Sequence, residues 1–403
     1  MSVVTLEDLN DDETDKRTSA IVYLSVVMAL GIPGNLLVIA VYFGTLKRRQ
    51  GTHWIFIRAL ALTDLLVCTI AIPFELFQQT HQLTFYSEFG CKFFRAVSVH
   101  LSMTSSLLLI AMSGNRLRRV CQPLKHQLTQ QQALVCIAVV VAIGILFCWP
   151  EAVISGISLE HIDKYNLTGY DCSFSDRLSG KEYTTIYSTL LLAMYISCMI
   201  ALVIMYAIVG RQVLKRAKVL NSHRQNCKIN PSQTGTEETS CGHHSDDTID
   251  DKSSNEKSVS VAIVKLSDVA TKDESKKPKG KCKKCKPGTG KNASKKVTRI
   301  AFAISFCFIL SYLPYVAVKL NASVVKGRFV STPLTKAIFP ILARTFIINN
   351  IINPIIYGFL DPTFLQHCEM TLRLMFCMKL KDFGVQKRHV CQYYFHVIQN
   401  YVT

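Results

Sequence analysis

Two charged side chains in this sequence lie in or next to long apolar runs. Asp64 is part of LALTDLLV, and Arg116 ends an apolar run that starts at Val97. A charge at the centre of a bilayer costs on the order of 3 kcal/mol, so Asp64 needs polar partners inside a helix bundle. The polar residues on neighbouring runs that are best placed as partners are Asn35, Ser105, Asn349 and Asn353. A packed polar network that only orients the helices is the alternative.

Arg116 has two readings of its own. With the arginines that follow it, it could be an anchor whose long side chain reaches the lipid headgroups. The alternative is a functional role for Arg116, which depends on the motifs elsewhere in the sequence. No nucleophile, base and orienting group converge at a sensible spacing, so we do not expect an enzyme.

The composition predicts a membrane protein. Of the 403 residues, 49% are hydrophobic and 18% are charged, and the mean hydropathy is +0.24. These values are unusual for a soluble chain. Residues 1–17 are acidic where a cleavable signal peptide would be basic, so we expect the first apolar helix to direct insertion.

Seven apolar runs are long enough to cross a bilayer, whose core of about 30 Å needs roughly 20 helical residues. They are residues 21–44, 55–79, 91–117, 132–155, 184–210, 298–322 and 334–358. The sequence therefore predicts an all-α membrane protein with a seven-transmembrane helix bundle. The predicted organisation is an acidic N-terminus at 1–19, helices one to five at 20–210, a disordered basic loop at 211–297, helices six and seven at 298–358, and an amphipathic membrane-surface helix with a tail at 359–403.

The basic residues next to the runs predict the orientation, because Lys and Arg near helix ends favour the cytoplasmic side. They collect after runs one, three and five and before run six, for example at Lys47, Arg119, Lys215 and Lys296. We expect a multi-pass plasma-membrane protein with its N-terminus extracellular and its C-terminus cytoplasmic. The net charge of +18 then favours contact with anionic lipid. We do not expect nucleic-acid binding, since the basic clusters border the spans and lack an aromatic platform.

The fifteen cysteines fit this orientation. Only Cys91 and Cys172 fall on the oxidising outer side, and we predict that they form a disulfide. Asn166 in NLT and Asn321 in NAS are outer-side glycosylation sequons. The single CxxC pair of Cys282 and Cys285 is too weak a pattern to predict a metal site.

Several short motifs occur in order along the runs. They are GN at 34–35, LALTDLL at 60–66, the outer Cys91, NR at 115–116 with VCQPL, SYLP at 311–314 and NPIIY at 353–357. Together they resemble the rhodopsin-like, or class A, family of G-protein-coupled receptors over about residues 20–377, and the CQPLKHQ loop resembles the neuropeptide-receptor branch.

The resemblance implies a fold, partners and roles for named residues. Arg116 would be the inner switch, moving toward Tyr206 and Tyr357 when span six swings outward to admit a heterotrimeric G protein. Pro314 and Pro354 would be hinges of this movement. Asp64, Ser105, Asn349 and Asn353 would form a pocket for an allosteric sodium ion, and no other metal or cofactor is implied.

The sequence departs from the family pattern around the expected switch. Asn115 replaces the usual acidic residue before Arg116, Leu117 replaces the usual tyrosine after it, and Tyr312 replaces the common tryptophan before Pro314. Ser294, Lys295 and Lys296 stand where many relatives place a glutamate. We therefore expect a weakly held resting state.

The outer halves of the spans suggest the class of ligand. Ser98 replaces the aspartate of amine receptors, and Ile347 replaces the retinal-binding lysine of opsins, so neither ligand is expected. The remaining candidates for ligand contact, with Ser98, are Glu75, Arg95, Tyr315, Lys319 and Arg344. Such a mixed-charge set suits a peptide better than a lipid. Internal pairing, such as Glu75 with Arg95 or Arg344, is the alternative role of any one of them.

The inner loop and tail suggest further partners. The loop is rich in Ser and Thr, which suits a receptor kinase and arrestin, and few of its residues are aromatic. Cys368 and Cys377 lie in the amphipathic segment and are palmitoylation candidates. A decoy or scaffold receptor remains an alternative because of the altered NRL motif. A transporter or channel is a further one, although no internal repeat supports it.

The missing carboxylate before Arg116 leads to a prediction. We expect ligand-free signalling to be measurable and not to rise when Asn115→Asp restores the acid, because a carboxylate next to the guanidinium stabilises its resting position. G-protein activation at matched surface expression measures this. A higher signal in the variant would contradict it.

Overall fold

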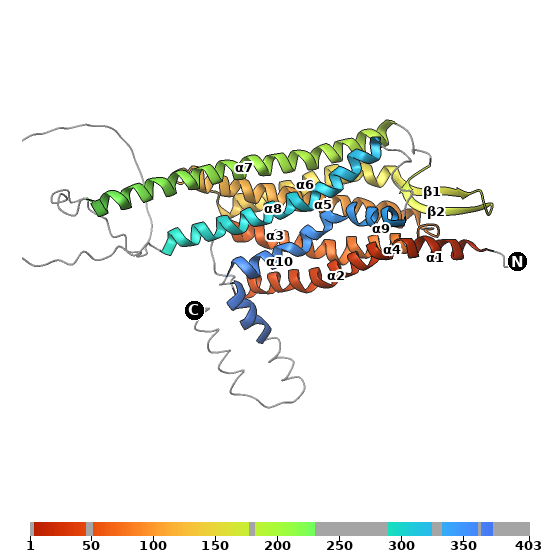
Figure 1. Ribbon diagram of the computed structural model, residues 1–403, viewed down its shortest axis with the longest axis horizontal. Helices are drawn as coiled ribbons and strands as arrows, with labels where there is room; N and C mark the ends of the chain where they lie inside the picture. The colour runs from red at the N-terminus through yellow and green to blue at the C-terminus, as the bar shows by residue number, and fades with distance from the viewer. Residues whose placement is uncertain are drawn as a thin grey trace, which may run out of the picture. The chain divides into compact units, whose positions relative to one another are not determined.

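The computed structural model describes residues 4–45, 51–176, 182–229, 289–324, 333–361 and 364–373 of the chain. The chain divides into two compact units, one of Met1–Arg216 with Thr289–Thr403 and one of Ala217–Gly288. The second unit lies mostly outside the described residues. All elements that position the site belong to the first unit, whose helices run along one common axis (Figure 1).

Six helical stretches of the described chain are long and apolar enough to cross a membrane, namely Thr18–Phe43, Thr52–Thr80, Glu88–Cys121, Gln130–Ile154, Glu182–Arg216 and Arg299–Leu320. They are built from α2 (Thr18–Ile39) with π-helical η1 (Ala40–Thr45), α3 (Thr52–Leu66) with π-helical η2 (Val67–Ala71) and α4 (Ile72–Thr80), α5 (Glu88–Cys121), α6 (Gln130–Ile154), α7 (Glu182–Ile229) and α8 (Thr289–Val324). Each overlaps one of the first six predicted runs.

The seventh predicted run is helical but interrupted. It consists of α9 (Pro333–Leu342), the 3₁₀ turn η3 (Thr345–Ile348) and α10 (Asn349–Leu360). The stretch Thr345–Leu360 is apolar but shorter than the other spans. Pro340 and Pro354 lie inside α9 and α10, and proline cannot donate the backbone hydrogen bond that a continuous helix requires.

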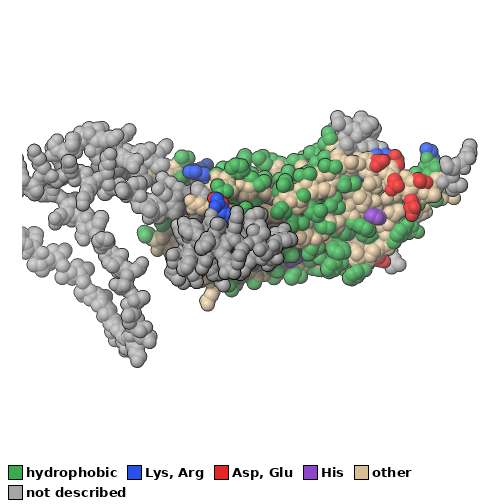
Figure 2. Space-filling model, turned by 90° about the horizontal axis from the view of Figure 1, so that it is seen from below, with side chains coloured by type: hydrophobic (Ala, Val, Ile, Leu, Met, Phe, Trp, Pro, Cys, Tyr) green, Lys and Arg blue, Asp and Glu red, His purple; other side chains and the backbone are tan. Residues whose placement is uncertain are grey.

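The outer surface of the bundle is apolar in its middle. Val22, Leu146 and Ile200, on three different helices, are exposed by 56%, 63% and 54%. Hydrophobic side chains cover the middle of the face in Figure 2, and most of the acidic side chains visible there gather at one end. An apolar belt of this kind faces lipid in a membrane protein.

The acidic N-terminus contains a helix that the sequence analysis missed. In α1 (Leu6–Lys16), the Thr5 hydroxyl accepts from the Asp8 N–H at 3.2 Å, and Asp8 Oδ2 accepts from the Thr5 N–H at 2.8 Å. This capping box is the signal that could have located the helix. Asn10 fastens α1 to the end of α4, because its Nδ2 donates to the Thr80 carbonyl at 2.9 Å and its Oδ1 accepts from the Leu83 N–H at 3.1 Å.

A two-stranded antiparallel sheet departs from the all-α prediction. Strands β1 (Ser155–Ile162) and β2 (Leu167–Phe174) pair from Ser155↔Phe174 to Ile162↔Leu167. Asn166, in the turn between them, has a φ of 51°, a conformation that asparagine tolerates better than most residues. The strands are polar and short, so apolar periodicity does not reveal them.

The hairpin is held at one end of the bundle by covalent and hydrogen bonds. Cys91 and Cys172 form a disulfide with a Cα–Cα distance of 5.5 Å, which confirms that prediction. Phe85 and Leu83 exchange backbone hydrogen bonds with Tyr170 at 2.9 and 2.8 Å. The hairpin, α1 and α9 therefore mark one end of the bundle, and we name it the disulfide end (Figure 1).

Two predicted boundaries need correction. We predicted disorder over 211–297, but α7 continues to Ile229 and α8 begins at Thr289. No Pro or Gly occurs in residues 211–229, so nothing in the sequence stops the helix there. Residues 230–288 lie outside the described residues. After α10, residues 364–373 are helical as expected for the surface helix, and the tail from 374 lies outside the described chain.

Gly31 permits close packing between three spans. A Cβ at this position would overlap Cys68 Sγ and lie 3.0 Å from Ile351 Cγ2. Small residues allow membrane helices to approach in this way.

We expect Gly31→Ala to lower the melting temperature of the purified protein, because overpacking costs about 1–3 kcal/mol. The double variant Gly31→Ala/Cys68→Ala should recover part of the loss, since it removes the overlapping sulfur. Gly210→Ala is the control, because an added Cβ there meets nothing within 4 Å. Equal losses for Gly31→Ala with and without the Cys68 change would contradict this account.

Candidate functional site

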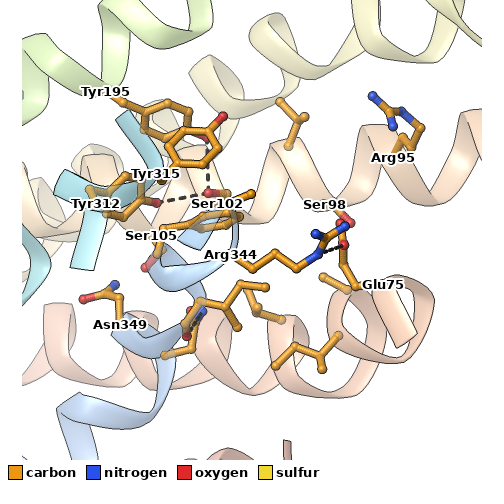
Figure 3. Close-up of a pocket in the computed structure, with 18 of the residues that line it drawn as sticks. Glu75, Arg95, Ser98, Ser102, Ser105, Tyr195, Tyr312, Tyr315, Arg344 and Asn349 are labelled. Atoms are coloured by element: carbon orange, nitrogen blue, oxygen red, sulfur yellow. Dashed lines mark hydrogen bonds and ion pairs between the residues drawn. The ribbon is translucent and has the colours of Figure 1, made fainter. Parts of the chain in front are cut away.

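A cavity of about 360 Å³ opens between the helices near the disulfide end (Figure 3). Its lining includes all six residues that the sequence analysis proposed for ligand contact, namely Glu75, Arg95, Ser98, Tyr315, Lys319 and Arg344. They come from α4, α5, α8 and the turn before η3. The structure therefore brings the whole predicted set together around one space.

Two ion pairs lie in the wall of the cavity. Arg344 Nε donates to Glu75 Oε2 at 2.9 Å, which is one of the internal pairings that the sequence analysis left open. Arg95 pairs instead with Glu151, with 2.8 Å between Nε and Oε1. The Ser155 hydroxyl donates to the same oxygen at 2.9 Å.

Glu151 is a site residue that the sequence analysis missed. Its side chain is only 5% exposed, and it lies near the end of α6. A carboxylate directly after the apolar run that ends in Trp149 and Pro150 was the available signal. By the same argument as for Asp64, such a charge needs a partner, and Arg95 supplies it.

The floor of the cavity is aromatic and its hydroxyl groups bond to one another. Tyr195 donates to Ser102 Oγ at 3.2 Å, and the Tyr312 hydroxyl lies 3.1 Å from the same atom. The Phe346 ring centre lies 5.6 Å from that of Tyr312 and 5.0 Å from that of Tyr315. Tyr312, which was predicted to belong to the switch, thus lies at the base of the cavity (Figure 3).

Further charged interactions involve the residues that line the cavity. Asp171, on β2, interacts with Arg95 and Arg17. Burial raises the pKa of the Asp171 carboxyl above its ordinary value, while the two arginines act in the opposite direction. The Lys319 ammonium lies 5.8 Å from the centre of the Tyr315 ring, within reach of a cation–π contact.

Asp64 lies below the cavity and is fully buried. Asn353 Nδ2 donates to its Oδ2 at 2.6 Å, and the Ser105 hydroxyl donates to its Oδ1 at 3.3 Å. Asn35 bonds elsewhere, to the Gly31 and Asn350 carbonyls at 3.0 and 2.8 Å. The structure thus joins two of the four expected partners directly to the carboxylate.

The region around Asp64 has the oxygen atoms that a hard cation prefers. Asn349 Oδ1 and Asn353 Oδ1 are buried and accept no hydrogen bond within the described chain. Ser105 and Asn349 also line the cavity, so the carboxylate region adjoins its floor. These side chains fit the sodium ion that the resemblance implies.

Arg116 lies toward the opposite end of α5, and only 5% of its surface is exposed. It interacts electrostatically with Tyr206. The Tyr206 hydroxyl donates to the Ala301 carbonyl of α8 at 2.8 Å and accepts from Ser113 at 3.1 Å. Tyr357 packs against Tyr42 and Phe364, with ring centres 6.1 and 5.9 Å away.

Residues 34–357 match the family described as 7 transmembrane receptor (rhodopsin family). The chain belongs to this family. The receptor is similar to human cholecystokinin receptor type A, with 24% identity over 356 residues that cover 85% of this chain and 78% of the relative. It is also similar to mouse G-protein coupled receptor 84, with 23% identity over 377 residues covering 86% and 90%, and to rat neuromedin-U receptor 2, with 26% identity over 216 residues covering 52% and 54%. The family is one of receptors, and not of enzymes.

Where the family pattern has an acid before Arg116, the receptor uses a hydroxyl group on another helix. Asn115 Nδ2 donates to Thr52 Oγ1 at 3.2 Å, and Arg119 Nη2 donates to the same oxygen at 2.6 Å. Both Asn115 and Thr52 are buried. One hydroxyl at the start of α3 therefore holds two residues near the C-terminal end of α5.

The predicted glycosylation and palmitoylation sites differ in their exposure. Asn166 is exposed at the tip of the hairpin, where a glycan has room. The side chain of Asn321 lies outside the described residues. Cys368 is buried, and Cys377 lies outside the described chain, so glycosylation and palmitoylation stay predictions.

The hydrogen bonds to Thr52 can be tested by substitution. We expect Thr52→Val to raise ligand-free signalling several-fold, because it removes the acceptor of a bond from a charged group, worth about 1.5–3 kcal/mol. Thr52→Ser keeps the hydroxyl and should behave as the unchanged receptor. Thr63→Val is the control on the same helix, since among the described residues the Thr63 hydroxyl bonds to the Ala59 carbonyl of its own helix and to no other group. Equal signalling by the valine and serine variants at position 52 would contradict the role of the hydroxyl.

Proposed function

We propose that this chain is a cell-surface receptor for a neuropeptide or peptide hormone and that it activates a heterotrimeric G protein. The main support is the cavity, which combines five charged side chains with an aromatic floor. The cholecystokinin and neuromedin-U receptors among its relatives are named for peptides, which agrees with this ligand class.

The disulfide end faces outward in this proposal, and the Arg116 end faces the cytoplasm. A disulfide forms in an oxidising compartment, and the lysines and arginines next to the spans favour the inner side. The N-terminus is then extracellular and the C-terminus cytoplasmic. A ligand reaches the cavity from outside, past α1 and the hairpin.

The hydrogen bonds of the resting structure suggest how binding is transmitted. Ligand contact with Tyr315 or Tyr312 moves α8, and Pro314, which lies between these two tyrosines in the chain, provides a bend in the helix. Outward movement of that half breaks the bond from Tyr206 to the Ala301 carbonyl. The Tyr206 hydroxyl is then released toward Arg116, and Pro354 lets Tyr357 approach the same side chain.

The sodium ion acts on the resting state in this scheme. Asp64, Ser105, Asn349 and Asn353 would hold it through their oxygen atoms. A bound cation would supply a positive charge next to the Asp64 carboxylate and so stabilise the resting arrangement of these side chains.

Other partners follow from the inner segments. A receptor kinase and arrestin would use the Ser and Thr residues of the inner loop, and anionic lipid would contact the basic helix ends. A non-coupling decoy is the alternative that the altered motif at 115–117 raises. The buried position of Arg116 beside Tyr206 favours the coupled receptor.

Removal of Arg116 tests the proposal directly. We expect Arg116→Ala to reduce ligand-free G-protein activation to background, because the guanidinium would then be missing from the cavity that admits the G protein. The signal is measured in cells across the main G-protein families at matched surface expression. Arg118→Ala is the control, since Arg118 is an exposed arginine on the same helix. A basal signal unchanged by Arg116→Ala would contradict the proposed switch.

A further inference from the structure

The charges around the cavity are not balanced. Three cationic side chains, Arg95, Lys319 and Arg344, line it together with two carboxylates, Glu75 and Glu151. Lys319 interacts electrostatically with all four of the others. The lining therefore carries an excess of one positive charge. Outside the lining, Asp171 interacts with Arg95 and Arg17 interacts with Arg344, while Glu160 acts on both Asp171 and Arg17.

The hydrogen-bond donors are unbalanced in the same direction. Arg95 directs Nε and Nη2 at a single oxygen of Glu151. Arg344 directs Nε at Glu75 and Nη1 at the Pro340 carbonyl. Within the described chain, Arg95 Nη1 and Arg344 Nη2 thus have no acceptor. Ser98 Oγ, also in the lining, is buried and makes no hydrogen bond to a described residue.

The ion pairs fix the direction of both guanidinium groups before a ligand arrives. Each glutamate binds one edge of its arginine, which leaves Arg95 Nη1 and Arg344 Nη2 without an acceptor among the described residues. Figure 3 shows the Arg344 guanidinium held beside Glu75. A guanidinium held in this way presents donors in a planar fork that matches a carboxylate. A ligand that replaced Glu151 would leave a buried charge unpaired, and that is costly.

The floor below these arginines is mainly aromatic. The hydroxyls of Tyr195, Ser102 and Tyr312 bond to one another. The rings of Tyr312, Tyr315 and Phe346 supply the apolar surface. This part of the cavity suits an aromatic or aliphatic side chain.

We propose that the cavity recognises a carboxylate of the peptide ligand between Arg95 and Arg344, with a bulky apolar side chain next to it on the floor formed by Tyr312, Tyr315 and Phe346. The inference deepens the proposed function, because it states which chemical group that peptide must present. The carboxylate comes from the C-terminus of the peptide or from an aspartate or glutamate next to an apolar residue.

Direct binding of small probes to the purified full-length receptor tests this. The probes are N-acetyl-Phe-Phe with a free carboxylate, the same dipeptide as its amide, and N-acetyl-Asp-Phe amide. Titration of the thermal shift gives their affinities. We expect the first probe to bind about tenfold more tightly than its amide, as the loss of a charge-assisted bond implies. The aspartyl amide distinguishes the two sources, since it binds like the acid only if a side-chain carboxylate suffices.

Substitutions of Glu75 and Arg344 should change the preference for the acid probe over its amide in opposite directions. Glu75→Gln removes a negative charge and keeps Arg344, so it should tighten binding of the acid. The double variant Glu75→Gln/Arg344→Gln removes the guanidinium without leaving an unpaired acid, and it should abolish the preference over the amide. Arg58→Gln is the control, because Arg58 lies in a span but does not line the cavity.

Equal affinities of acid and amide, tighter binding of the amide, or no shift with any probe would each overturn the proposal. So would a preference for the acid that survives in the double variant. Because the readout is binding, these outcomes are independent of G-protein coupling. The signalling test of Arg116→Ala can therefore fail while the carboxylate site stands, and the reverse also holds.

Discussion

The hydrocarbon core of a bilayer offers no water to a polar group, and the structure of this receptor follows from that constraint. The backbone satisfies it by forming helices through the core. Polar side chains satisfy it by turning inward and pairing, as Asp64 does with Asn353 and Ser105. The same requirement places Glu151 against Arg95 and Glu75 against Arg344.

Inward-facing polar groups connect the two ends of the bundle. The hydroxyl of Tyr312 forms part of the cavity floor and also lies 3.3 Å from Ser106 Oγ, one helical turn below Ser102. Ser105, which bonds to Asp64, is next to Ser106 on α5. Ser113, which bonds to Tyr206, lies about two helical turns further along. A shift of α8 at the floor therefore changes hydrogen bonds at several depths of the same core.

The sequence predicts a contact best where a residue has very few possible partners. Asp64 had to find partners among a few polar residues, and Cys91 had one cysteine available on its side of the membrane. The pairing of Arg95 was not predictable in this way, because Glu151 lies some 56 residues later on another helix and its approach depends on how α5 and α6 pack. Helix packing is decided by shape at many contacts, which no single motif encodes.

The remaining differences between the predicted and the observed elements concern α1, the hairpin and α7. The capping box of α1 was present in the sequence, but the prediction for this segment considered only its acidic charge. The hairpin depends on the disulfide and on backbone bonds to Tyr170, which are contacts between distant residues. The extension of α7 reflects good helix-forming residues in a loop whose composition suggested disorder.

The attachment of the hairpin has a consequence for the kinetics of binding. Its strands are fixed by the disulfide, by the Gln78 side chain on the Cys172 carbonyl at 2.7 Å, and by Ser155, which bonds to Glu151. These contacts order the hairpin when the receptor folds, so a ligand loses no affinity to the entropy of ordering it. An entrance that is already shaped also makes association depend on orientation and charge, and not on the rate of loop closure.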